Sequence, residues 1–236
     1  MRAGLFNGCT CFVLQRCGNE LAHFLNSNNQ LSFENVHKIG IKLLTLLEQL
    51  HSIGYIHKDL KTANILVGEF NCLNSLSELK LIDFGLASQY VKIDEMRKPL
   101  HEGEHIAYGP CSQAGNLAFC SFRTFKGVQL SRRDDIVSLG YLMLYLSSGR
   151  HPFIYDKDGN QSKQILKEQK LRMKPKEICS LMKCEHLTAF LEEAYAIKFK
   201  EEPNYNKLRF LLERNLLDKA LIPSRQINWL GVDNNL

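Results

Sequence analysis

The sequence predicts an α+β fold that is mainly α-helical and carries one small β-hairpin. Three observations predict it: a long helical pattern at residues 32–54, two short apolar runs after it, and helical patterns through most of the second half. The 236 residues suffice for one large domain, and a hydrophobic content of 44% is enough to fill its core.

The first elements are short, and a long helix follows them. Residues 11–14 form an apolar run that reads as a strand ending before Gly18, and residues 20–25 are expected to form a short helix. Ser32 is a favourable N-cap and Gly54 a favourable stop, so a helix is predicted between them. Its apolar positions recur at helical spacing: Val36, Ile39, Leu43, Leu47 and Leu50.

The remaining elements follow from strand-sized runs and helical periodicity. Residues 65–67 and 79–82 are predicted as strands of a hairpin, joined by a polar loop at 71–78. No periodicity is clear from 88 to 121, a length of irregular chain that is usually functional or disordered. Helices are then expected at 135–147, 163–173, 186–198 and 207–218.

Composition indicates a soluble cytoplasmic or nuclear protein. The formal charge of +5 is mild, so neither a nucleic-acid nor a membrane partner is expected. The apolar run at 136–146 is too short to cross a bilayer, and no signal peptide is apparent. None of the eight cysteines forms a Cys-x-x-Cys motif, and reduced structural thiols are favoured over a zinc site at Cys179, Cys184 and His186.

Two polar motifs lie on either side of the predicted hairpin. Residues 57–64 (HKDLKTAN) join the long helix to the first strand, and Asp83-Phe84-Gly85 follows the second strand. A carboxylate that ends a strand and precedes glycine can approach a metal-bound phosphate closely. Each motif alone is modest evidence of function, but the two motifs in this order, on opposite sides of a predicted hairpin, are a specific combination.

Together the two motifs resemble the catalytic loop (here residues 57–64) and the magnesium-binding motif of protein kinases. The resemblance implies that Asp59 accepts or orients the proton of a substrate hydroxyl and that Lys61 steadies the transferred phosphoryl group. It also implies that Asn64 and Asp83 hold Mg²⁺ against ATP. A lysine at position 61 resembles the residue found there in serine/threonine kinases, so protein substrates with Ser or Thr are expected. A small-molecule phosphotransferase of similar fold is disfavoured.

Further stretches resemble the casein kinase I family, and the likeness runs from about residue 11 to about residue 216. They are residues 115–127 (GNLAFCSFRTFKG) and residues 131–141 (SRRDDIVSLGY). The resemblance implies that Asp135 bonds the backbone of the catalytic loop. A plain helix N-cap is the alternative role for this carboxylate.

Residues 12–18 (FVLQRCG) look like the last strand of a kinase small lobe and the hinge that follows it. The resemblance implies a nucleotide pocket in which Leu14 guards the back, Gln15 and Cys17 meet adenine through their backbones, and Leu66 and Ile82 lie beneath it. Ordinary core packing is the alternative for these apolar residues.

The resemblance also implies a domain division and an incomplete kinase. Residues 1–17 would be a remnant of the small lobe, 18–222 the large lobe, and 223–236 a C-terminal tail. Neither a glycine-rich loop nor a strand lysine precedes the catalytic loop, so the chain is expected to be a truncated form with little activity alone. An incomplete gene model or isoform is favoured over a non-catalytic binding module or an inactive relative; the oligomeric state stays open.

Three departures from the family pattern bear on substrate choice. Lys58 stands where arginine is usual, Asn116 replaces a threonine, and Ala118 replaces an arginine that helps to bind an anion. Arg123 and Lys126 are interpreted either as compensating donors or as surface charges.

Overall fold

The computed structural model describes residues 2–13, 15–68, 78–92, 116–153, 162–223, 227 and 229. Leu14, most of the loop at 71–78, residues 93–115 of the irregular segment and most of the tail at 223–236 lie outside the described residues. Within the described part, helices dominate and the strands pair into two-stranded sheets, in agreement with the expected α+β class.

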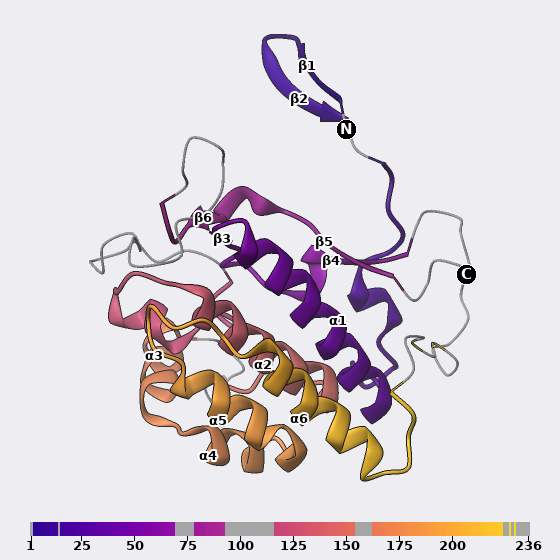
Figure 1. Ribbon diagram of the computed structural model, residues 1–236, viewed down its shortest axis with the longest axis vertical. Coiled ribbons are helices and arrows are strands. Elements are labelled where there is room, and N and C mark those ends of the chain that lie inside the picture. The colour runs from indigo at the N-terminus through magenta and orange to yellow at the C-terminus, as the bar shows by residue number, and fades with distance from the viewer. Residues whose placement is uncertain are drawn as a thin grey trace.

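A hairpin that the sequence revealed only in part opens the chain. Strand β1 (Arg2–Phe6) pairs antiparallel with β2 (Cys9–Val13), so that Arg2 lies opposite Val13. Asn7 and Gly8 join them with φ of 49° and 77°, the left-handed pair that a tight hairpin turn requires. Figure 1 shows this hairpin standing apart from the helical body. Residues 11–13 of the predicted strand therefore have a partner strand before them.

Helix α1 (Phe33–Ser52) confirms the predicted long helix. The Oγ of Ser32 accepts a hydrogen bond from the backbone N–H of Asn35 at 3.2 Å, and Gly54 follows the helix with φ of 87°. The apolar stripe is fully buried at Val36, Ile39, Leu43 and Leu47. The short helix η1 (Leu21–Phe24) before it is also present, as expected.

Two small sheets flank the catalytic loop. β4 (Ile65–Val67) pairs antiparallel with β5 (Leu79–Leu81), which confirms the predicted hairpin. β3 (Tyr55–Ile56) pairs with β6 (Ser88–Gln89), two strands of two residues each that no apolar run predicted. The catalytic loop therefore runs between β3 and β4 and is closed by the short helix η2 (Thr62–Asn64).

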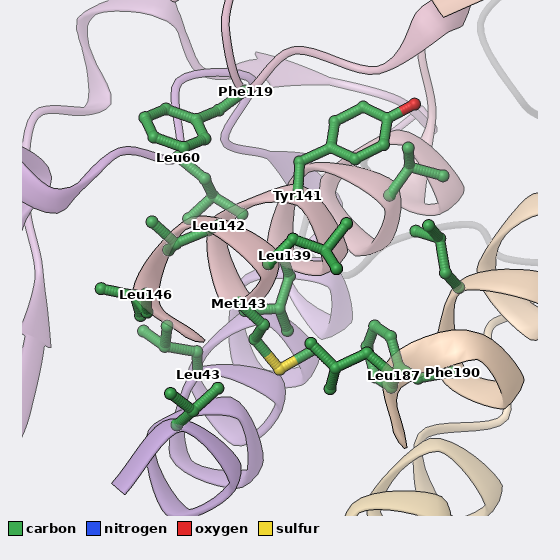
Figure 2. Close-up of a cluster of buried hydrophobic side chains, with 14 of the residues drawn as sticks. Leu43, Leu60, Phe119, Leu139, Tyr141, Leu142, Met143, Leu146, Leu187 and Phe190 are labelled. Atoms are coloured by element: carbon green, nitrogen blue, oxygen red, sulfur yellow. The ribbon is translucent and has the colours of Figure 1, made fainter. Parts of the chain in front are cut away.

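Helix α2 (Arg132–Ser148) is the central element of the body. Figure 2 shows its residues Leu139, Leu142 and Met143 among side chains that include Leu43 of α1 and Phe190 of α5 (Thr188–Ala196). Helices cross it closely, since a Cβ on Gly40 of α1 would lie 2.5 Å from the sulfur of Met143. The side chains around it are buried.

Among the helices of the described residues, none is long and apolar enough to cross a membrane.

The later helices follow the predicted order with one addition. They are α3 (Lys163–Arg172), α4 (Pro175–Leu181), α5 (Thr188–Ala196) and α6 (Tyr205–Leu217), with the short helices η5 (Phe122–Lys126) and η6 (Glu185–Leu187). Helix α4 was not predicted, although Pro175 occupies its first turn. The predicted helix at 186–198 begins as η6 and ends at Ala196.

Candidate active site

Asp59 is the centre of the polar groups in the catalytic loop. Its side chain is 6% exposed and accepts hydrogen bonds at both oxygens. Oδ2 accepts from Nζ of Lys61 at 2.7 Å and from Nδ2 of Asn64 at 3.1 Å, while Oδ1 accepts from the backbone N–H of Asn116 at 2.7 Å. The structure thus brings together three predicted residues and adds Asn116 from a distant segment.

These contacts decide the charge of Asp59. Burial acts to raise its pKa, but the hydrogen bonds from Lys61 and Asn116 and the charge of Lys61 outweigh burial, so the pKa falls below its ordinary value. Asp59 is therefore an ionised carboxylate at neutral pH, held in one orientation. Such a group can accept or orient a hydroxyl proton.

The Asp83-Phe84-Gly85 motif is anchored to the catalytic loop through His57. The ring of Phe84 lies edge-on to the ring of His57, with centroids 5.2 Å apart. His57 Nε2 pairs with the carbonyl of Ile82 at 3.1 Å, and its Nδ1 accepts from the backbone N–H of Asp59 at 3.2 Å. The His57 imidazole therefore connects the two motifs. These two hydrogen bonds fit the tautomer with its proton on Nε2.

Asp83 presents an exposed carboxylate. Its backbone is in the left-handed region, with φ of 62°, and its Oδ1 accepts a hydrogen bond from the backbone N–H of Gly85 at 3.2 Å. A Cβ on Gly85 would lie 3.1 Å from that oxygen, so a larger residue would crowd the carboxylate. The glycine after Asp83 thus keeps the approach to it open.

Asn64 and Asp83 offer the hard oxygen ligands that Mg²⁺ prefers. The Nδ2 of Asn64 donates to the backbone oxygen of Asp59 at 2.9 Å as well as to its carboxylate, so the amide oxygen is the atom suited to a metal. The carbonyl of Asn64 accepts the N–H of Ile82 at 2.9 Å, which holds the two strand ends together. No cluster of three or more His, Cys, Asp or Glu suited to a metal occurs among the described residues.

Asp135 fixes the backbone of the catalytic loop, as the resemblance implied. Its Oδ2 accepts the N–H of His57 at 2.7 Å and its Oδ1 accepts the N–H of Lys58 at 2.9 Å. Lys58 is held with φ of 67°, a strained value for a residue with a Cβ. The N-cap of α2 is instead Ser131, whose backbone N–H donates to Oδ2 of Asp134 at the third helical position at 2.8 Å.

Two buried residues of this network carry no motif in the sequence. His51 Nε2 pairs with Oδ2 of Asp135 at 2.9 Å, and its Nδ1 pairs with the hydroxyl of Tyr205 at 2.6 Å. Burial acts to raise the pKa of Asp135, but the contacts with His51 and His57 lower it overall. The only sequence signal was a histidine at the end of an otherwise apolar helix face.

The chain that follows the predicted hinge pairs with β4 and the residue after it, and Glu20 forms a bridge with Leu66. Gly18 N–H donates to the Gly68 carbonyl at 3.1 Å, and Val67 N–H donates to the Asn19 carbonyl at 2.8 Å. Gln15 is exposed, whereas Cys17, Leu66 and Ile82 are half-buried, and Leu14 lies outside the described residues. The contact of these residues with a nucleotide stays a prediction.

The segment at 116–127, here called the substrate segment, corrects the interpretation of Arg123. Its side chain is 10% exposed, its Nη2 donates to the Tyr195 carbonyl at 2.9 Å, and its Nη1 lies 3.6 Å from Oδ1 of Asp134. Arg123 is therefore neither a surface charge nor a donor to a substrate anion. Lys126 is exposed, and the amide of Asn116 is turned toward the N–H of Ala118 at 2.9 Å.

Comparisons with known proteins show what this chain is similar to. Residues 7–208 match the family model of the protein kinase domain. A probable casein kinase I homolog of Encephalitozoon cuniculi is 31% identical over 216 residues, which cover 89% of this chain and 64% of that protein. A casein kinase 1-like protein of Oryza sativa subsp. japonica is 33% identical over 216 residues, 90% of this chain and 29% of that protein.

A more distant likeness extends the comparison to a third named kinase. Serine/threonine-protein kinase VRK2 of Homo sapiens is 30% identical over 207 residues, 85% of this chain and 38% of that protein. The chain thus spans less than two thirds of the length of each of these three relatives.

Proposed function

Because the chain belongs to the protein kinase family, with relatives of casein kinase I type, we propose that it transfers the γ-phosphate of ATP to Ser or Thr of protein substrates. One observation carries the proposal: Asp59 is buried, ionised and held at both oxygens by Lys61, Asn64 and Asn116. Phosphoryl transfer depends on such positioning and on charge neutralisation more than on covalent chemistry.

In this proposal each polar residue named at the candidate site has one task. Asp59 accepts or orients the proton of the attacking hydroxyl. The ammonium of Lys61, 2.7 Å from Asp59 and partly exposed, faces both the base and the incoming phosphoryl group. Asn64 and Asp83 would hold Mg²⁺, which when bound would supply charge neutralisation at the phosphates. Asp135 and His51 keep the backbone of the catalytic loop in place during phosphoryl transfer.

The nucleotide would lie on the edge of β4 and its neighbouring hinge. Leu14, Gln15, Cys17, Leu66 and Ile82 are the residues we assign to it, with residues 1–17 as part of a small lobe, 18–222 as the large lobe and 223–236 as a tail. The support is the backbone pairing of residues 18–19 with β4, which sets the hinge beside Leu66. We also assign the protein to the cytoplasm or nucleus.

The test is transfer of labelled phosphate from ATP to casein and to Ser- and Thr-containing peptides, with single-turnover amounts of the protein so that slow transfer is still seen. Asp59→Asn is the inactive variant, and Asp218→Asn, an exposed change at the end of α6, is the matched control. In keeping with the little activity expected of this chain alone, we expect slow transfer by the wild type and the control and none by Asp59→Asn. Equal labelling by wild type and Asp59→Asn, or nucleotide binding with no transfer by any of them, would contradict the proposal.

A further inference from the structure

Lys170 and Cys120 form a buried amine–thiol pair that the proposed mechanism does not use. Lys170, on α3, is 1% exposed, and its Nζ donates to the backbone carbonyl of Cys120 in the substrate segment. The same nitrogen lies 3.7 Å from Sγ of Cys120. A nitrogen and a sulfur are thus in contact between two elements distant in sequence.

The surroundings of Lys170 make its nitrogen more nucleophilic than that of an exposed lysine. Nζ lies 4.8 Å, 4.9 Å and 5.8 Å from the ring centroids of Tyr141, Phe153 and Phe125. Burial among these rings lowers the pKa of Lys170 to about 8, an effect that the contact with Cys120 offsets only in part. A fraction of the amine is therefore neutral at physiological pH, with a lone pair beside the sulfur.

We propose that Lys170 and Cys120 are a redox-sensitive pair that a peroxide joins through a reversible sulfenamide bond. In the first step the Cys120 sulfur attacks hydrogen peroxide, and the thiol proton passes, directly or through the Lys170 amine, to the departing hydroxide, so that the amine ends neutral. An S–O bond forms, the O–O bond breaks, and one water leaves, so that the sulfur is oxidised to sulfenic acid and peroxide is reduced. In the second step the neutral Lys170 amine attacks the sulfur, the N–S bond forms, the S–O bond breaks, and a second water leaves.

The overall balance is thiol plus amine plus hydrogen peroxide to sulfenamide plus two waters. Condensation of a sulfenic acid with a nearby nitrogen is established protein chemistry, and a thiol reverses it. Hydrogen peroxide is small, and Cys120 keeps 4% of its surface exposed. By contrast, burial raises the pKa of Cys179 to about 12 and also raises that of Cys184, which keeps these two thiols protonated and unreactive.

The bond would tie α3 to the substrate segment. That segment also carries Asn116, whose N–H holds the carboxylate of Asp59 at 2.7 Å. The covalent step itself is independent of the proposed kinase function; only its consequence, a restriction of the segment beside Asp59, rests on that function. Mass spectrometry therefore tests the bond without any assay of activity.

The experiment treats the folded full chain with hydrogen peroxide and maps its peptides by tandem mass spectrometry before and after dithiothreitol. We expect a linked pair of peptides two hydrogens lighter than their sum, loss of tryptic cleavage after Lys170, and loss of alkylation at Cys120. Dithiothreitol should restore the cleavage and the alkylation. Cys120→Ala and Lys170→Met should each abolish the link, whereas Lys167→Met, an exposed change on the same helix, should leave it intact.

Two results would overturn the inference. One is Cys120 recovered as unchanged thiol, as sulfinic or sulfonic acid, or in a disulfide, while Lys170 stays fully cleavable. The other is an unchanged link in Lys170→Met. Circular dichroism of each variant shows that it is folded, and the peptide map of the wild type decides the question even if Lys170→Met does not fold.

Discussion

Asp135 binds the backbone of His57 from inside the buried helix α2, with its Oδ2 2.7 Å from the His57 nitrogen. The same carboxylate accepts the N–H of Lys58, and both partners lie beside Asp59. A carboxylate is the residue type that fits, because it accepts at both oxygens and donates nothing. The position of Asp59, the proposed base, is therefore set by a residue 76 positions away in the sequence.

The first prediction concerns this carboxylate. Asp135→Asn places an amide N–H₂ against either a backbone N–H or His51, so one buried donor loses its acceptor. We expect a loss of about 2–4 kcal/mol in the free energy of unfolding and faster amide exchange in the catalytic loop. Urea denaturation and hydrogen exchange measure these effects. Asp218→Asn serves as the control, and a loss no greater than that of the control would contradict the assigned contacts.

The second prediction concerns the buried pair of Arg123 and Asp134. Asp134 is 3% exposed, and burial raises its pKa while the charge of Arg123 acts to lower it. Removal of Arg123 therefore leaves a buried carboxyl group without the positive charge that stabilises its ionised form. Arg123→Leu should cost about 3–5 kcal/mol in the free energy of unfolding. The double variant Arg123→Leu with Asp134→Asn should lose clearly less than the sum of the single variants. Strict additivity in urea denaturation would show that the two side chains do not interact.

The third prediction concerns acid stability and His186. Burial, with His37 and Lys219 nearby, lowers the pKa of His186 from 6.5 to about 4. The folded protein therefore holds the ring neutral, while the unfolded chain protonates it below pH 6.5, so stability is lost as the pH falls from about 6.5 to about 4.

His186→Gln removes the titrating ring, so its free energy of unfolding should depend less on pH over that range. His37, whose pKa burial also lowers, keeps part of the dependence in this variant. His23→Gln, at an exposed histidine, is the control and should retain the full wild-type slope. Identical slopes for wild type and His186→Gln would show that His186 is not held neutral.

Much of the body could be predicted because its signals are local. Ser32, Gly54 and a helical apolar stripe were sufficient for α1, and two short apolar runs were sufficient for the β4–β5 hairpin. The two-residue strands β3 and β6 are too short to show a period, and they exist only because their backbones meet in space. Helix α4 had a local signal in Pro175 and Glu177, but its seven residues are shorter than a clear helical period needs.

The candidate site was predictable for a different reason. Asp59, Lys61, Asn64 and Asp83 stand in motifs whose order is specific, and the structure gathers Lys61 and Asn64 around Asp59. His51 and Tyr205 could not be found this way, because their partner Asp135 is far away in sequence. Arg123 was misinterpreted for the same reason: its charge suggested the surface, but Asp134 compensates for it inside the protein.

The most direct test of the central claim is the affinity for ATP with and without Mg²⁺ in wild type, Asp83→Asn and Asp59→Asn, measured by isothermal titration calorimetry. If Asp83 holds the metal and Asp59 the substrate hydroxyl, Asp83→Asn should weaken Mg²⁺-dependent binding by about tenfold or more, the loss of one charged ligand. Asp59→Asn should leave the affinity nearly unchanged. Equal losses of affinity in the two variants, or no effect of Mg²⁺ on the wild type, would contradict the division of roles between these carboxylates.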